Sequence, residues 1–162
     1  MKTQQCVSCG THDGMHHFSG RTFTIDYKQF ARVVHHIAGW ECQVCHEIEF
    51  DQQTDSAKRY SDASDKLLED CFQIMGSEMK RIRRKLHLTQ KDAVALLSGG
   101  GHNAFSRYER GEIAPPQALF ALMHLLDRHP HLLAEVQALS EGTNLRRLLA
   151  ERFPEHETAL VT

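Results

Sequence analysis

The segment Met79–Gly111 reads MKRIRRKLHLTQKDAVALLSGGGHNAFSRYERG, and this stretch decides the fold of the C-terminal half of the chain. Thr89 and Asn103 are residue types that begin helices, and three consecutive glycines stand between them. The segment therefore predicts a helix from Thr89 to Leu97, a glycine break and a short second helix from Asn103 to Arg110. Two short helices joined in this way are typical of a helix-turn-helix.

Similar helix signals extend on both sides of this segment, where Pro115 and Pro116 suit the start of a helix. We predict five helices, over residues 77–86, 89–97, 103–110, 116–128 and 130–139. Together they form an all-α, five-helix helix-turn-helix domain over 77–140 for DNA binding and dimerisation. Residues 141–162 are then a C-terminal tail.

Charge is distributed unevenly along the chain, although the net charge is only -2. Residues 1–76 hold 7 Lys and Arg against 11 Asp and Glu, whereas residues 79–111 hold 8 basic residues against 2 acidic ones. A basic stretch of this length has the size of a DNA-binding footprint. The composition, 41% hydrophobic and 25% charged, is that of a globular protein.

The second helix of the motif offers a pair of side chains that can read DNA bases. Asn103 and Arg107 are four residues apart and share one helix face, whereas Phe105 and Tyr108 turn toward the core. In the major groove, Asn forms a bidentate pair with adenine and Arg with guanine. We therefore predict that Asn103 and Arg107 make the DNA base contacts.

Other residues of the motif suit the DNA backbone. Thr89 and Gln90 begin the preceding helix, whose amides and dipole favour a phosphate, and basic residues such as Arg84 add positive charge. We assign Arg84, Thr89, Gln90 and Ser106 to backbone contacts. The alternative is that the basic run is a solvated helix face and that Asn103 is only an N-cap.

The N-terminal part of the chain carries two pairs of cysteines, Cys6-x-x-Cys9 and Cys42-x-x-Cys45. Two such knuckles can place four thiolates tetrahedrally around one ion, and zinc suits this ligand set best. A small segment without much apolar sequence gains its folding free energy from such an ion. We predict one structural Zn2+ per chain, and because four thiolates leave no open position, the site is not catalytic.

Other interpretations of these cysteines remain open. Cys42-Gln-Val-Cys45-His46 also fits a c-type haem attachment pattern, and a CxxC pair can act in redox chemistry or stay simply reduced. A histidine can replace a cysteine as a zinc ligand, and the candidates are His12, His16, His17 and His46. The fifth cysteine, Cys71, is expected to be a small buried apolar residue.

These patterns predict an α+β protein, with a small zinc-bound, β-containing N-terminal domain followed by the all-α domain. The zinc-binding domain spans residues 1–50 and contains at least two short strands, near 21–27 and 32–40, where apolar and β-branched residues alternate or cluster. Near-helical spacing of apolar residues predicts a linker helix over 51–76.

The motifs also resemble known families. Arg83–Gly111, which ends in Ser106–Gly111 (SRYERG), resembles the Xre/Cro-type helix-turn-helix family. Gly99–Glu109 (GGGHNAFSRYE) is similar to the GGGxNAFSRYE signature of MqsA-type antitoxins, and Leu125–Leu133 (LLDRHPHLL) resembles their LLDKHPELL segment. The paired CxxC module precedes both, so the resemblance covers roughly residues 6–138.

The resemblance implies an ion pair between Arg83 and Glu109, a first domain that binds zinc and contacts a toxin, and a second domain that dimerises and represses its operon. It places base contacts at Asn103 and Arg107. The expected function is that of a type II antitoxin that neutralises a cognate toxin protein and, as a homodimer, represses transcription from a palindromic double-stranded operator.

Two alternative functions remain. One is a stand-alone zinc-containing helix-turn-helix regulator without a toxin partner, and the other is a metalloenzyme or redox protein tethered to DNA. No triad, phosphate-binding loop or carboxylate pair stands out, so we expect no enzyme. The sequence shows neither a signal peptide nor a membrane span, so we expect a cytoplasmic protein with no membrane partner.

Overall fold

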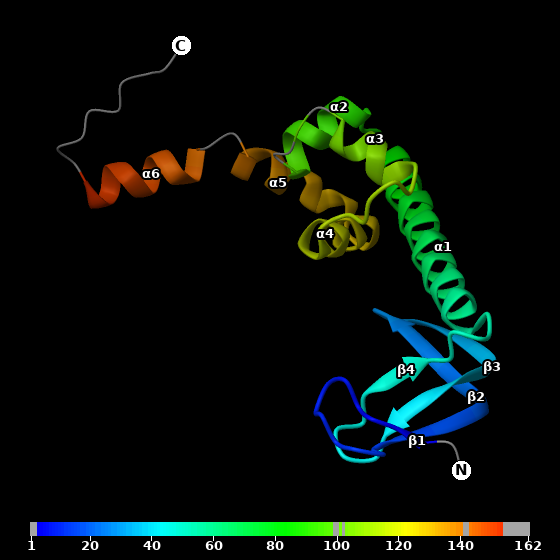
Figure 1. Ribbon diagram of the computed structural model, residues 1–162. Helices are drawn as coiled ribbons and strands as arrows, with labels where there is room; N and C mark the ends of the chain where they lie inside the picture. The colour runs from blue at the N-terminus through cyan, green and yellow to red at the C-terminus, as the bar shows by residue number, and fades with distance from the viewer. Residues whose placement is uncertain (1–2, 99–100, 102, 141–142, 154–162) are drawn as a thin grey trace. The chain divides into compact units, whose positions relative to one another are not determined.

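A computed structural model describes residues 3–98, 101, 103–140 and 143–153 (Figure 1). The chain divides into two compact units, Met1–Cys71 and Phe72–Thr162. Of the predicted glycine break, Gly99 and Gly100 lie outside the described residues, as do residues 154–162 of the predicted tail. Across the described parts, no helix is both long enough and apolar enough to cross a membrane.

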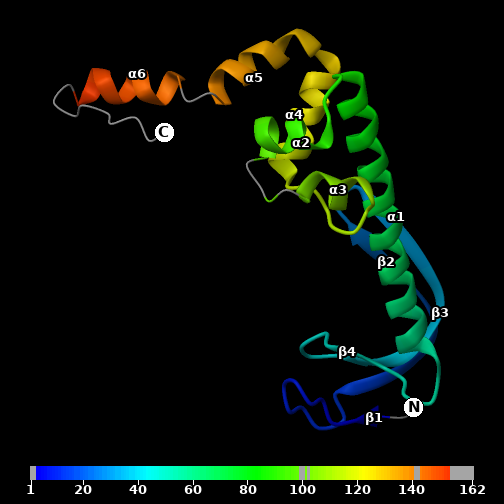
Figure 2. The ribbon, with the colours of Figure 1, turned by 90° about the horizontal axis from the view of Figure 1, so that it is seen from above.

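The first unit is built on a four-stranded antiparallel sheet with the order β1-β2-β3-β4. Its strands are β1 (Thr3–Gln4), β2 (Met15–Tyr27), β3 (Phe30–Cys42) and β4 (Ile48–Phe50). Figure 2 shows β2 and β3 running side by side and curving along their length. The two long strands form a hairpin with a tight two-residue turn, in which Tyr27 pairs with Phe30.

This hairpin is longer than the two short strands that the sequence predicts. The register between β2 and β3 shifts twice, between Phe18 and Arg21 and between Arg21 and Phe23. Gly20 lies in this irregular region and has a φ of 70°, a backbone conformation that glycine adopts without strain. Because such irregularities interrupt the alternation of apolar and polar residues, the N-terminal half of β2 has no strand signal in the sequence.

The N-terminal part of helix α1 (Ser56–Lys85) packs against this sheet. The buried hydroxyl of Ser56 accepts a hydrogen bond of 2.9 Å from the amide of Ala38, and Arg59 donates to the carbonyl of His35 at 2.6 Å. Farther along the helix, Arg32 and Asp70 form an ion pair of 2.6 Å. The buried side chains of this unit include Ile25, Val34, Ile37, Leu67 and, as expected, Cys71.

The linker helix and the first helix of the second unit are one continuous element, which corrects the expectation of a separate helix beginning at Ser77. α1 passes through Gly76 without interruption. A Cβ atom at Gly76 would lie 2.4 Å from the carbonyl oxygen of Tyr108, so only glycine fits where these two segments cross. The glycine therefore marks a close helix contact rather than a helix end.

The second unit is helical. Besides the end of α1, its elements are α2 (Gln90–Ala93), a π-helical turn (Val94–Ser98) that continues it, α3 (Ala104–Glu109), α4 (Gln117–Arg128), a 3-10 turn (Pro130–Leu132), α5 (Leu133–Ser140) and α6 (Thr143–Arg152). Figure 1 shows α2, α3 and α4 gathered around the C-terminal half of α1.

One apolar core joins α1 through α4, and partly buried residues of α5 pack against it. Phe105, Met79, Ile82, Met123 and Leu126 are fully buried in it. The predicted α+β class is thus confirmed: a four-stranded antiparallel sheet that carries a cluster of four cysteines is followed by a helical region.

Candidate metal centre and helix-turn-helix surface

The two CxxC pairs fold into two turns of the same geometry. In the first, the amide of Gly10 donates to the carbonyl of Cys6 at 2.9 Å, and in the second the amide of His46 donates to the carbonyl of Cys42 at 3.0 Å. Gly10 and His46 occupy equivalent positions, with φ values of 74° and 60°. Each turn therefore aims its two thiols in one direction, one pair from the segment after β1 and the other from the end of β3.

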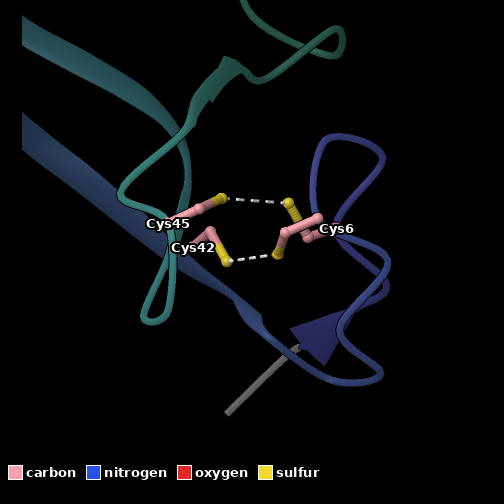
Figure 3. Close-up of side chains that lie close together, drawn as sticks. Cys6, Cys42 and Cys45 are labelled. Atoms are coloured by element: carbon pink, nitrogen blue, oxygen red, sulfur yellow. Dashed lines mark hydrogen bonds between the residues drawn. The ribbon is translucent and has the colours of Figure 1, made fainter.

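The four sulfur atoms converge on one point, as Figure 3 shows. The Sγ atoms of Cys6 and Cys45 are 3.6 Å apart, as are those of Cys9 and Cys42, and all four lie within 4.8 Å of one another. Bonds of about 2.3 Å from zinc place tetrahedral sulfur ligands roughly 3.8 Å apart. The cluster can therefore hold a metal ion, and all four cysteines are free of disulfide bonds.

The pKa values of two of these thiols shift in opposite directions. Hydrogen bonds from the hydroxyl and the backbone of Thr11 lower the pKa of Cys9 from 9.0 to about 6. At Cys45, a hydrogen bond from the backbone of Glu47 is outweighed by desolvation and by the neighbouring thiols, which raise its pKa to about 12. Because four thiolates at this separation repel one another, a bound divalent cation would favour the ionised form of all of them.

None of the four candidate histidines joins the cysteines in the cluster that the described residues form. His17 instead contacts the carboxylate of Asp51 at 3.2 Å and packs edge-on against the ring of Trp40. His46 is exposed, and its backbone amide closes the second turn by donating to the carbonyl of Cys42. The structure therefore gives His46 a backbone role in the turn, with a positive φ.

In the second unit, Thr89 begins α2 with a reciprocal capping box. Its hydroxyl accepts from the amide of Asp92 at 3.1 Å, and the Asp92 carboxylate accepts from the amide of Thr89 at 3.1 Å. The side chain of the next residue, Gln90, donates to Glu109 at 2.7 Å. The side chains of Thr89 and Gln90 are thus engaged within the protein, although both residues are exposed at the start of α2.

Arg83 and Glu109 form a bidentate ion pair between α1 and α3. Arg83 also donates to the carbonyl of Leu88 at 2.7 Å, at the loop that leads into α2. Both side chains are largely buried, with 11% and 4% of their surface exposed. This pair therefore joins three segments of the helix-turn-helix.

The exposed polar residues at α3 include Asn103, which precedes the helix, and Arg107, which lies within it. Phe105 and Tyr108 are buried in the core, whereas Asn103 and Arg107 are exposed. Asn103 occupies the N-cap position of α3, although within the described residues its side chain makes no capping hydrogen bond. The hydroxyl of Ser106 accepts a hydrogen bond of 2.6 Å from Arg110.

The basic residues of α1 divide into those that form ion pairs within the protein and those that are exposed to solvent. Arg81 and Lys85 both bind the carboxylate of Asp127 on α4, each at 2.7 Å. They hold the pKa of this carboxyl well below its ordinary value of 3.8 through hydrogen bonds from Arg81 and then Lys85. Arg84 is exposed. The sequence alone did not identify Asp127, because nothing in a run of basic residues shows which ones pair within the protein.

Comparisons with known proteins agree with this architecture. Residues 4–137 match the model of the family described as the antitoxin component of bacterial toxin-antitoxin systems, MqsA. A curated relative, Antitoxin MqsA of Escherichia coli (strain K12), is 49% identical over 57 residues, which cover 35% of this chain and 43% of the relative. The family is non-enzymatic, as the sequence predicts. Because the family model spans both units, the chain belongs to the MqsA family of antitoxins.

Proposed function

We propose that this protein neutralises a cognate toxin and represses its own operon by binding a palindromic operator as a zinc-containing homodimer. One observation carries the DNA-binding part of this proposal. Asn103, at the N-cap of α3, and Arg107, within the helix, are exposed to solvent, while Phe105 and Tyr108 anchor the opposite face of the helix in the core.

The support for base recognition is rigidity. A side chain that discriminates between bases must be held by a fixed backbone, because a bidentate pair tolerates little displacement. Gly76 allows α1 to approach the backbone of Tyr108 closely, and the buried pair of Arg83 and Glu109 ties α3 to α1. The recognition residues thus stand on a braced helix. Arg84, Ser106 and the start of α2 at Thr89 and Gln90 supply the backbone contacts in this proposal.

We assign the four-cysteine cluster to one structural Zn2+. Cys6, Cys9, Cys42 and Cys45 join the segment after β1 to the end of β3, and in the part of the chain that the structure describes a small apolar cluster, with Met15 and Trp40, packs beside them. The ion would hold these segments together, and as a closed four-thiolate site it supplies no open position for catalysis. We propose that the toxin binds to the acidic first unit.

The homodimer follows from the size of the DNA-binding module, because one helix-turn-helix buries too little surface for tight operator binding. Our candidate for this contact is the leucine-rich stretch Leu119–Leu133, and the alternative is that its leucines only fill the core of the helical unit. Leu119, Met123 and Leu126 fill the core of one protomer, whereas Leu125 is 47% exposed on α4. The proposed interface therefore centres on Leu125.

The test for the repressor role uses the full chain and the DNA upstream of its own gene. The expected result is binding to one palindrome in this region, at least a thousandfold tighter than to scrambled DNA of the same length, with about one dimer per site. Equal affinity for both DNAs would contradict sequence-specific repression. Sedimentation of a Leu125→Glu variant, which should be monomeric, tests the dimer in the same series.

The test for the toxin uses co-expression with the neighbouring reading frame. Co-purification in a fixed stoichiometry, together with rescue of growth, is the expected result. A protein that binds its operator but neither binds the neighbouring product nor relieves its toxicity would be the stand-alone regulator.

A further inference from the structure

The backbone turns back on itself where α3 ends. Gly111 has a φ of 68°, and the amide of Glu112 donates to the carbonyl of Arg107 at 3.0 Å, five residues earlier. This is the hydrogen bond of a glycine-terminated helix cap. Gln73 of α1 also holds this turn, since its side-chain amide donates to the carbonyl of Arg110 at 3.1 Å. The position of Glu112 beside Arg107 is thus set by the backbone.

The carboxylate of Glu112 lies between two arginines on the face that we assign to DNA. One oxygen is 3.4 Å from Nε of Arg107, and the other accepts from Nε of Arg110 at 2.6 Å. Arg110 in turn donates to the hydroxyl of Ser106. The contact with Arg107 is made at Nε, and the two terminal Nη atoms carry the remaining donors of this guanidinium.

Stability does not explain an acidic residue at this place. A carboxylate near the C-terminal end of a helix interacts unfavourably with the helix dipole. The side chains of Glu112 and Arg107 are 44% and 50% exposed, and ion pairs this exposed contribute little to folding. On a DNA-binding face, a carboxylate also repels phosphates. A role in recognition is therefore the alternative to a stabilising role for Glu112.

We infer that Glu112 is a positioning residue that gives Arg107 its preference for guanine over phosphate. With Nε held by Glu112, both Nη atoms are free to form the bidentate pair with guanine O6 and N7, so the ion pair survives in the specific complex. A phosphate of non-specific DNA draws the whole guanidinium toward the backbone, and Arg107 must then leave Glu112. The inference rests on the proposed DNA-binding function.

The test measures the affinity of the full chain for its operator and for scrambled DNA at several salt concentrations. Glu112→Gln should bind scrambled DNA about threefold more tightly and lower the ratio of specific to non-specific affinity by about fivefold. The salt dependence on scrambled DNA should become steeper by about one phosphate contact, because Arg107 is released to the backbone. Glu112→Asp keeps the charge and should restore most of the ratio.

An Arg107→Ala background separates this role from a structural one. There, Glu112→Gln should leave the affinity ratio unchanged, since the group that Glu112 positions is gone. A ratio that is unaffected by Glu112→Gln, or that falls equally with and without Arg107, would overturn the inference while the operator preference of the unaltered protein upholds the proposed function. If the unaltered protein has no operator preference, both fall.

Discussion

Arg83 of α1 and Glu109 of α3 form a bidentate ion pair, although 26 residues separate them in the sequence. Gln90 of α2 donates to the same carboxylate, and Arg83 also holds the carbonyl of Leu88. One buried pair therefore fixes the three helices whose relative placement determines where Asn103 and Arg107 point.

Arg83→Ala should lower the free energy of unfolding of the helical unit by about 2 to 3 kcal/mol, because it leaves the carboxylate of Glu109 buried without its cation. Urea unfolding followed by far-UV circular dichroism measures this loss. Arg84→Ala is the matched control, since its exposed side chain should contribute little to stability. Equal stability of the two variants would show that the pair does not brace the motif.

The helix-turn-helix and the cysteine turns show which structural features can be predicted from the sequence. The Thr89 cap, the end of α3 at Gly111 and the CxxC turns depend on local chemistry, and each could be predicted from a few adjacent residues. The resemblance to a family, rather than any local pattern, pointed to Arg83 and Glu109.

Features that depend on distant contacts were missed. A glycine in the middle of a helix usually signals a break, but Gly76 is set by the backbone of Tyr108, which lies far along the chain. The strands β1 and β4 are two and three residues long, too short to show any periodicity. Asp127 and Glu112 carry no sequence signal, because an acidic residue looks the same in a sequence whether or not it contacts an arginine.

The ion pairs of Arg81 and Lys85 on α1 with Asp127 on α4 should make the free energy of unfolding depend on pH. Arg81 and Lys85 depress the pKa of Asp127 below its ordinary value of 3.8 in the folded protein. A depressed carboxyl pKa stabilises the fold above the unfolded value, and this contribution is lost as the pH falls through the folded pKa. Asp127→Asn should therefore be less stable than the unaltered protein at neutral pH, and the difference should shrink below about pH 4.

Urea unfolding from about pH 7 to about pH 3 checks this pH dependence. Glu135→Gln is the control, because Glu135 is an exposed carboxylate on α5. A difference between Asp127→Asn and the unaltered protein that stays constant over this range would show that the two cations do not act on the Asp127 carboxylate.

Metal content tests the cysteine cluster. We expect one zinc per chain by elemental analysis and none after Cys6→Ser and Cys42→Ser together, since this variant removes one ligand from each turn. A structural zinc site contributes roughly 10 kcal/mol to folding, so the first unit should unfold, which the fluorescence of the single tryptophan, Trp40, reports. The helical unit should keep its circular dichroism, because its core is separate from the cluster.

Cys71→Ser is the control for this experiment, because Cys71 is buried elsewhere and lies outside the four-cysteine cluster. It should retain one zinc per chain. One zinc per chain in the double variant would mean that the assigned ligands are wrong.

The recognition face is tested most directly by separating base contacts from phosphate contacts. Arg107→Ala should cost about 1 to 3 kcal/mol on the cognate palindrome and relax the preference for one guanine per half-site, while weak non-specific binding persists. Asn103→Ala should do the same at an adenine. Arg84→Ala should instead weaken binding to every sequence and reduce the salt dependence, because a phosphate contact is lost and no base contact changes.

Binding isotherms on matched and scrambled DNA at several salt concentrations distinguish base contacts from phosphate contacts. If Arg107→Ala weakens binding to both DNAs equally, Arg107 contacts the backbone, and the exposed face of α3 is not the surface that reads the operator.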